Sequence, residues 1–329
     1  MAADAGATVL ESKDDQPKMP EKKKTKFDVL IIGAGPAGYT AGIYCSRAGY
    51  DTLIISGILP GGQLVNTTEV ENYPGFENGI MGPDLMIEMR KQTLRMGTAI
   101  IDDEAVDVDF RQEPFKVLTG SEEYEGRAVI IATGANPRKM GLQGEQMFGG
   151  RGVSYCATCD GPFFRNQELV VVGGGDSAVE EATFLTKFAT TVHLVHRRDK
   201  LRASKIMQQR AFDNEKIKFH WDSEISDIKG DQKVQQAVIK NIRTEQEKTL
   251  DVGGVFVAIG HEPNTKLFQN QIDLDKDGYI ILKNKTKTNM DGIFAAGDVH
   301  DRAYRQAITA AGYGCMAAID LDKYLTEKS

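Results

Sequence analysis

Two glycine-rich turns, each placed between an apolar strand and a helix, constrain the fold of this chain more than any other feature. The first, Gly33-Ala-Gly35-Pro36-Ala37-Gly38, follows an apolar run at 27–32 and precedes a predicted helix over 39–48 and a strand over 52–55. The second, Gly173-Gly-Gly175-Asp176-Ser177-Ala178, follows a run at 169–172 and precedes a helix to about 187 and a strand over 191–195. Glycines admit a pyrophosphate and helix amides stabilise its charge, so each turn predicts a dinucleotide site. We therefore expect an α/β chain with two Rossmann-like units and two dinucleotides.

Composition narrows the functional class. The chain has 329 residues, of which 41% are hydrophobic and 26% charged, which suits two packed domains. No apolar run approaches the roughly 20 residues of a membrane-spanning helix, and the N-terminus lacks the apolar core of a secretory signal. We expect a cytoplasmic protein with no membrane partner. A net charge of −7 argues against nucleic acid as the main partner.

Cys156 and Cys159 form a Cys-Ala-Thr-Cys pair followed directly by Asp160 and Gly161. Two thiols at this spacing can form and reopen a disulfide, and a neighbouring acid can transfer the proton that exchange requires. The alternative is half of a structural zinc site, but such a site needs a second pair at similar spacing. The other two cysteines, Cys45 and Cys315, stand alone in apolar segments and are expected to be buried. We expect redox chemistry and no metal.

The second unit carries basic residues where its second strand ends. His196, Arg197 and Arg198 follow that strand, and Arg202 comes shortly after. Arginine at this position suits a 2′-phosphate, which it binds through forked, charge-assisted hydrogen bonds. The sequence therefore predicts NADPH rather than NADH in this unit, with a solvated basic turn as the alternative.

The first unit lacks the acid that usually binds ribose, because its second strand ends at Ser56 and Gly57. Another acid, Asp298, follows Gly297 at the end of a predicted strand, and a helix is expected to begin near residues 304–307. An acid and helix-start amides there can hold a ribityl chain and a flavin ring. Two more apolar runs, 128–134 and 254–260, are expected to be the matching return strands of two similar domains.

Taken together, these motifs make the chain resemble the low-molecular-weight thioredoxin reductases over nearly all of residues 27–325. The marks that carry the resemblance are the two glycine-rich turns, the Cys156 to Gly161 segment, and the segments 61–64, 71–75, 196–199 and 297–309. The resemblance implies an FAD domain made of residues 27–138 plus 264–329 and an NADPH domain of 139–263 inserted into it. It also implies a homodimer, a rotation between the domains, and hinges near 134–137 and 260–263. Residues 1–26 are polar, mixed in charge and poor in apolar side chains, so they are expected to form a disordered tail.

The resemblance and the turn arguments together give the candidate site residues. For FAD they are Gly33, Gly35, Pro36, Ala37, Gly38, Ser56, Gly61, Gly62, Gln63, Leu64, Asn72, Thr133, Gly134, Gly297, Asp298, Arg305, Gln306 and Ala307. For NADPH they are Gly173, Gly175, Asp176, Ser177, Ala178, His196, Arg197, Arg198 and Arg202.

The expected reaction passes electrons from NADPH through FAD and the Cys156–Cys159 pair to the disulfide of thioredoxin. Asp160 is the candidate acid that protonates the departing sulfur, although Asp-Gly is also a common turn. Which cysteine attacks thioredoxin is left open. The alternatives are a related reductase with another donor, such as ferredoxin, or another protein acceptor, and a flavin-bound redox sensor that does not turn over.

Overall fold

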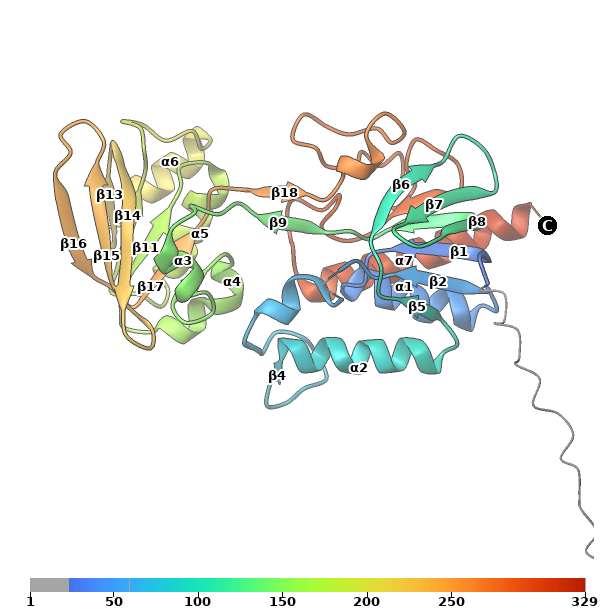
Figure 1. Ribbon diagram of the computed structural model, residues 1–329. Coiled ribbons are helices and arrows are strands. Elements are labelled where there is room, and N and C mark those ends of the chain that lie inside the picture. The colour runs from blue at the N-terminus through green and yellow to red at the C-terminus, as the bar shows by residue number, and fades with distance from the viewer. Residues whose placement is uncertain (1–23, 59, 329) are drawn as a thin grey trace, which may run out of the picture.

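Two α/β bodies joined by a narrow ribbon make up the protein (Figure 1). The structure, a computed structural model, describes residues 24–58 and 60–328. Most of the expected tail, residues 1–23, lies outside the described residues. The first strand, β1, begins at Lys26, the last residue of the expected tail. The Lys26 ammonium lies 2.9 Å from the Glu125 carboxylate.

The first body is built on a largely parallel sheet whose central strands are buried on both faces. Its order is β5 (Ala99–Ile101), β2 (Thr52–Ile55), β1 (Lys26–Ile32), β8 (Glu123–Ile131), β7 (Phe115–Thr119) and β6 (Ala105–Asp109), with β19 (Ile293–Ala295) beside β8. β1, β2, β5, β19 and the end of β8 pair in parallel, whereas β6, β7 and the start of β8 form an antiparallel meander. Continuous apolar runs such as Thr52–Ile55 suit strands covered on both sides.

Helices cover one face of this sheet and aromatic residues cover the other. α1 (Pro36–Arg47) and α7 (Ala307–Glu327) pack there through small side chains, including Ala41 and Ala317, in one buried cluster with α2 (Gly82–Arg95). On the opposite face Phe110, Phe115 and Phe268 share a second cluster. The short elements of this body are η1 (Gly62–Asn66), β3 (Glu69–Val70), β4 (Ile80–Met81) and η3 (Lys266–Phe268).

The second body repeats the plan of the first. Its parallel sheet has the order β10 (Val153–Ser154), β17 (Gly254–Val257), β11 (Glu168–Val172), β12 (Thr191–Val195) and β13 (Ile217–His220). An antiparallel meander follows, formed by β14 (Ser223–Gly230), β15 (Val234–Asn241) and β16 (Glu247–Asp251). The helices are α3 (Gln143–Met147), α4 (Ala157–Asp160), η2 (Gly161–Phe164), α5 (Asp176–Leu185) and α6 (Lys205–Phe212). The predicted α/β class with two Rossmann-like units is confirmed.

The ribbon is one antiparallel pair of strands. β9 (Ala135–Pro137) carries the chain into the second body and β18 (His261–Pro263) carries it back, with His261 opposite Pro137 and Pro263 opposite Ala135 (Figure 1). Both crossings between the bodies therefore lie side by side. Within the described residues, no helix is long and apolar enough to cross a lipid bilayer.

Candidate active site

The first glycine-rich turn leaves an open space at the start of α1. Gly33 has φ +109°, and a methyl group on it would lie 2.3 Å from the Ala132 carbonyl oxygen, so the turn packs directly against the end of β8. By contrast, a methyl group on Gly35 would meet no described atom within 4 Å. Gly35 is the N-cap of α1, and no side chain caps it. The free helix-start amides face a gap that can take an anion such as a pyrophosphate.

The second turn has the same construction. Gly173 has φ +153°, and a methyl group there would lie 2.4 Å from the Ala258 carbonyl oxygen, behind β17. Gly175, the N-cap of α5, again borders open space. The two units thus offer equivalent gaps at two helix starts, one in each body.

The basic segment after β12 folds back onto the second turn. The Arg202 amide donates to the Gly174 carbonyl at 2.7 Å, and the Ser204 amide donates to Asp176 Oδ1 at 2.8 Å. Arg197, Arg198 and Arg202 are exposed beside the gap. The three guanidinium groups therefore belong to a segment that is held against the second turn and leaves them exposed to solvent.

His196 and Asp176, two of the NADPH candidates, are held by the protein itself. The His196 ring is buried beneath Gly174, and its Nε2 lies 3.1 Å from the Lys200 carbonyl oxygen. Burial is the main cause of its lowered pKa. Asp176 is occupied by the Ser204 amide. Ser177 is exposed in the first turn of α5, whereas Ala178 is buried in the core. In this structure His196 and Asp176 shape the arginine segment.

Around the first turn, the chain brings together most of the FAD candidates. The Gly61 amide donates to the Ala34 carbonyl at 3.0 Å, which places the segment 61–64 against the turn. Thr133 Oγ1 donates to the Asn264 carbonyl at 2.8 Å, and Gln63 Nε2 donates to Asn136 Oδ1 at 2.6 Å. The Ser56 hydroxyl uses its proton within the protein, because it donates to Asp102 Oδ1 at 2.9 Å.

Asp298 provides an unpaired polar atom at this site. Its Oδ1 is buried and, among the described residues, has no hydrogen-bond partner. Burial raises the pKa of Asp298 to about 7, and Asp301 adds to the rise while Arg305 opposes it. A buried acid without a partner is costly unless a ligand hydroxyl meets it. The residues present therefore fit a ligand that brings a hydroxyl group to Asp298, as a flavin nucleotide would.

The redox pair lies where the two bodies meet. Cys156 and Cys159 are joined in a disulfide, and Cys156 is the N-cap of α4. Across the contact, Gln306 at the N-cap of α7 approaches both sulfurs, with its Nε2 at 3.7 Å from Cys156 Sγ and 3.9 Å from Cys159 Sγ. Asn72 Nδ2 donates to Gln306 Oε1 at 3.2 Å. The disulfide of the second body therefore lies against the flavin candidates of the first.

Two acids are close to the disulfide. Asp160 ends α4, and burial raises its pKa while a hydrogen bond with Ser154 lowers it. Glu181 on α5 was missed by sequence reasoning, because it lies far along the chain from the cysteines. Its Oε2 is buried without a partner among the described residues, and burial raises its pKa to about 7 against the charge of Arg305 and a hydrogen bond from the Ala157 amide.

Arg305 connects several of these groups. Its Nη1 lies 2.7 Å from His261 Nδ1 on the ribbon, and its φ is +48°. Burial and the Arg305 charge lower the pKa of His261 to about 4, so the imidazole is neutral and can accept from the guanidinium. Sequence reasoning assigned Arg305 to the flavin. The structure also gives it a position between the ribbon and Glu181.

No metal centre is formed by the described residues, which bring together no set of three His, Cys, Asp or Glu side chains suited to an ion. Cys45 is buried, and burial raises its pKa to about 12, so it is a poor nucleophile. Cys315 is partly buried on α7.

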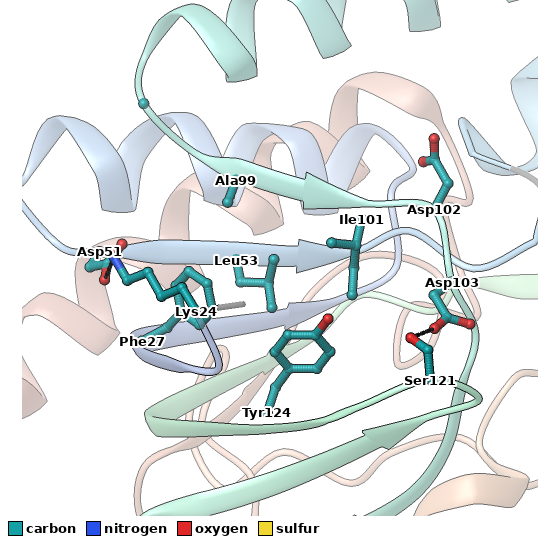
Figure 2. Close-up of a pocket in the computed structure, with 11 residues that line it drawn as sticks. Lys24, Phe27, Asp51, Leu53, Ala99, Ile101, Asp102, Asp103, Ser121 and Tyr124 are labelled. Atoms are coloured by element: carbon teal, nitrogen blue, oxygen red, sulfur yellow. Dashed lines mark hydrogen bonds and ion pairs between the residues drawn. The ribbon is translucent and has the colours of Figure 1, made fainter. Parts of the chain in front are cut away.

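A separate hollow of about 580 Å³ lies on the first body (Figure 2). None of the candidate site residues lines it. Its walls come from Lys24, Phe27, Asp51, Leu53, Gly97, Ala99, Ile101, Asp102, Asp103, Ser121 and Tyr124. Four of these, Phe27, Leu53, Ile101 and Tyr124, belong to or pack against the cluster on the face opposite α1. Ser121 Oγ donates to Asp103 Oδ2 at 2.8 Å, and Figure 2 shows this pair just beyond the end of β5.

Two nucleotide-type βαβ units with a disulfide held between their bodies define a nucleotide-dependent disulfide oxidoreductase. Comparison with known proteins agrees, since the model of the pyridine nucleotide-disulphide oxidoreductase family matches residues 27–314. A thioredoxin reductase of Mycolicibacterium smegmatis is 54% identical over 307 residues, covering 93% of this chain and 98% of the relative. The chain belongs to the pyridine nucleotide-disulphide oxidoreductases and, among them, to the low-molecular-weight thioredoxin reductases.

Solved structures extend the comparison. A thioredoxin reductase from Giardia duodenalis matches with a TM-score of 0.89 at 43% identity, covering 92% of this chain and 100% of that chain. The Lactococcus lactis enzyme in its FR conformation is 46% identical and covers 92% of this chain and 99% of its own, but its TM-score is 0.62. The second relative is therefore similar in sequence but different in overall shape.

Proposed function

We propose that the chain reduces the disulfide of thioredoxin with electrons from NADPH, using FAD bound to the first body and the Cys156–Cys159 pair of the second. The observation that supports this most strongly is the disulfide lying against the N-cap of α7, 3.7 Å from Gln306 Nε2, among the flavin candidates. Bound FAD and NADPH supply two-electron transfer from nicotinamide to sulfur, which side chains alone lack.

The proposed binding residues follow from the site. The gap at Gly35, with the segment 61–64 and Asp298, would hold FAD; the gap at Gly175, with Arg197, Arg198 and Arg202, would hold NADPH. Of the remaining candidates, His196 and Asp176 shape the arginine segment, and the others keep the roles that the sequence predicted. In this assignment FAD binds to residues 27–138 and 264–329, and NADPH to 139–263.

The protein's own residues carry out the exchange with thioredoxin. One thiolate of the reduced pair attacks a thioredoxin sulfur, which forms a mixed disulfide and releases the other thioredoxin sulfur. Asp160, half-buried and with a raised pKa, delivers the proton that neutralises the released sulfur. The second thiol of the pair then attacks the mixed disulfide, so the Cys156–Cys159 bond forms again and thioredoxin leaves with two thiols.

Absorbance of the bound flavin tests this proposal. Purified protein would be mixed with NADPH, or separately with NADH, and oxidised thioredoxin would then be added. We expect bleaching that prefers NADPH, followed by recovery of the flavin absorbance when thioredoxin is added. A bound flavin that NADPH fails to bleach would refute the assignment of the donor, and bleaching without recovery would refute that of the acceptor.

We also propose a homodimer. The exposed apolar side chains Tyr44 on α1 and Met316 and Ile319 on α7 lie on neighbouring helices of the first body, and a second copy can cover them. Sedimentation analysis should give twice the chain mass, and Ile319→Lys should shift the protein towards monomer. A wild-type monomer at micromolar concentration would refute the dimer.

A cytoplasmic location is proposed on chemical grounds. A dithiol that is regenerated from a nicotinamide nucleotide works in a reducing compartment, where other disulfides are rare. Immunodetection in separated cell fractions should find the protein with cytoplasmic markers, and its recovery with extracellular or membrane fractions would contradict the proposal.

A further inference from the structure

One side chain makes the polar contacts that join the two bodies. Outside the ribbon, every hydrogen bond between the bodies found among the described residues runs to Gln306. The strongest by geometry joins Gln306 Nε2 to Thr158 Oγ1 at 3.1 Å. The contacts to the two sulfurs are longer, at 3.7 and 3.9 Å. Thr158 is therefore the main hydrogen-bonding partner that the second body offers.

Gln306 is held in place by its own body. Asn72 Nδ2 donates to its Oε1 at 3.2 Å, its Nε2 also donates to the Tyr304 carbonyl at 3.3 Å, and its backbone amide donates to Thr309 Oγ1 at 3.3 Å. An amide fixed in this way is a ready-made donor, so little ordering is needed when Thr158 meets it. The position of the second body, rather than a change in Gln306, decides whether the bond exists.

Thr158 also contacts the redox pair itself. Its Oγ1 lies 3.2 Å from Cys156 Sγ, and its side chain is exposed at the edge of the contact. A single hydroxyl between the Gln306 amide and the Cys156 sulfur therefore connects the disulfide to the N-cap of α7. Alanine or valine at this position would preserve the Cys-x-x-Cys spacing but could not make this connection.

Two body placements are needed if the proposed function is correct, because both cysteines here are only partly exposed and their sulfurs lie within 3.9 Å of Gln306 on the first body, whereas a protein substrate must reach them directly. The difference in TM-score between the Giardia duodenalis and Lactococcus lactis structures, 0.89 against 0.62 at similar identity, shows that relatives differ in overall shape. A hydrogen bond that forms only in the placement seen here shifts the equilibrium between the two placements towards this one.

We propose that Thr158 is a positioning residue: its hydrogen bond to Gln306 favours the placement in which the disulfide lies against α7 over the one in which the redox pair is open to thioredoxin. This inference rests on the proposed function. A single net hydrogen bond changes such a balance by roughly 2- to 10-fold. Thr158, one of the two residues between the cysteines, thus sets the fraction of the protein in which the pair lies beside the flavin site.

Distance measurement between the bodies tests the proposal without relying on turnover. Spin labels at Lys91→Cys on α2 and Lys248→Cys on β16, both exposed, would report the body placement in the oxidised protein with FAD bound, in a Cys315→Ser background. Labelled chains would be diluted with unlabelled protein so that only distances within one chain are measured. Pulsed electron paramagnetic resonance then gives the population of each placement.

Thr158→Val removes the hydroxyl at nearly constant shape, and Thr158→Ser keeps it as the matched control. We expect the valine variant to lose the α7-facing placement by roughly 2- to 10-fold relative to the other, while the serine variant matches the wild type. An unchanged distance distribution in the valine variant, or an equal change in both variants, would overturn the proposal.

Rapid kinetics separates this inference from the function on which it rests. In the valine variant, electron transfer from reduced flavin to the disulfide should slow, and the rate of thioredoxin reduction by the already reduced pair should not fall. A wild-type protein that cannot reduce thioredoxin would refute the proposed function, yet the distance measurement would still decide whether Thr158 sets the placement. Equal slowing of both steps would indicate general damage and contradict a positioning role.

Discussion

Replacing Gly35 with alanine should weaken FAD binding while leaving the fold intact. The backbone at Gly35 has φ −79°, which any residue adopts, and a methyl group there meets no described atom within 4 Å. Alanine is a poorer N-cap than glycine by up to about 1 kcal/mol, but it restricts the unfolded chain by about 0.4–1 kcal/mol. These two effects oppose each other. The free energy of unfolding of the protein without bound FAD should therefore change by no more than about 1 kcal/mol.

The effect on FAD is expected to be much larger. The methyl group occupies the gap proposed for the pyrophosphate, and forcing an extra carbon into a packed site costs about 1–3 kcal/mol. That cost corresponds to roughly 5- to 150-fold weaker FAD binding. Calorimetric titration of FAD into stripped protein measures the affinity, and the flavin absorbance left after dialysis gives a simpler check.

Two further variants control this experiment. A methyl group on Gly38 would lie 1.9 Å from the Gly33 carbonyl oxygen, so Gly38→Ala must displace the turn and should lower the melting temperature by several degrees. Gly175→Ala adds the same methyl group to the other unit and should weaken NADPH but not FAD. If Gly35→Ala binds FAD like the wild type while remaining folded, the pyrophosphate does not lie at the start of α1, and the argument is wrong.

Further predictions concern individual side chains. Asp160→Asn should slow the reoxidation of reduced flavin by thioredoxin at least about 10-fold and leave its reduction by NADPH nearly unchanged in stopped flow; equal rates would remove Asp160 from the mechanism. Because burial raises the pKa of Asp298 to about 7, its ionisation destabilises the stripped fold, and this penalty grows as the pH rises towards 7. Asp298→Asn should therefore be more stable than the wild type at pH 8, by on the order of 4 kcal/mol, and nearly equal near pH 4; urea unfolding at both values would reveal any opposite trend. Arg198→Ala should raise KM for NADPH about 10-fold or more with little effect on NADH, and a parallel rise for both nucleotides would exclude a contact to the 2′-phosphate. Cys45→Ser should lose stability but retain turnover, and a loss of flavin reoxidation would show an unsuspected redox role.

Local patterns predicted the local elements because burial on both faces produces an apolar run. β2 and β12 occupy the predicted ranges 52–55 and 191–195. The strand expected over 128–134 shows the limit of this reasoning, because β8 instead covers Glu123–Ile131. The polar start of β8 pairs with β7 in the antiparallel meander, where no continuous apolar run is needed. The strand ends at Ile131, shortly before the chain enters the ribbon at Ala135. An apolar run identifies the covered part of a strand and not its full length.

Contacts between distant segments were beyond sequence reasoning. The missing acid after β2 illustrates this, since Asp102 from the end of β5 accepts the Ser56 hydroxyl and is itself paired with Arg90 at 2.7 Å. The contact of Gln306 with Thr158 likewise depends on how two separately folded bodies meet. His196 was expected at the nucleotide but is buried under Gly174, because strand-end position does not reveal which way a side chain turns.

The paired strands of the ribbon have a consequence for how such a protein can be altered. The chain leaves the first body and returns to it at one point, so the segment between β9 and β18 begins and ends at the same place. A segment whose two ends are adjacent can be inserted into a related protein in place of a surface loop, because its insertion does not require the rest of the fold to change. Exchanging the second body would therefore transfer the redox cysteines together with the nucleotide site proposed for it, while the first body keeps its own fold.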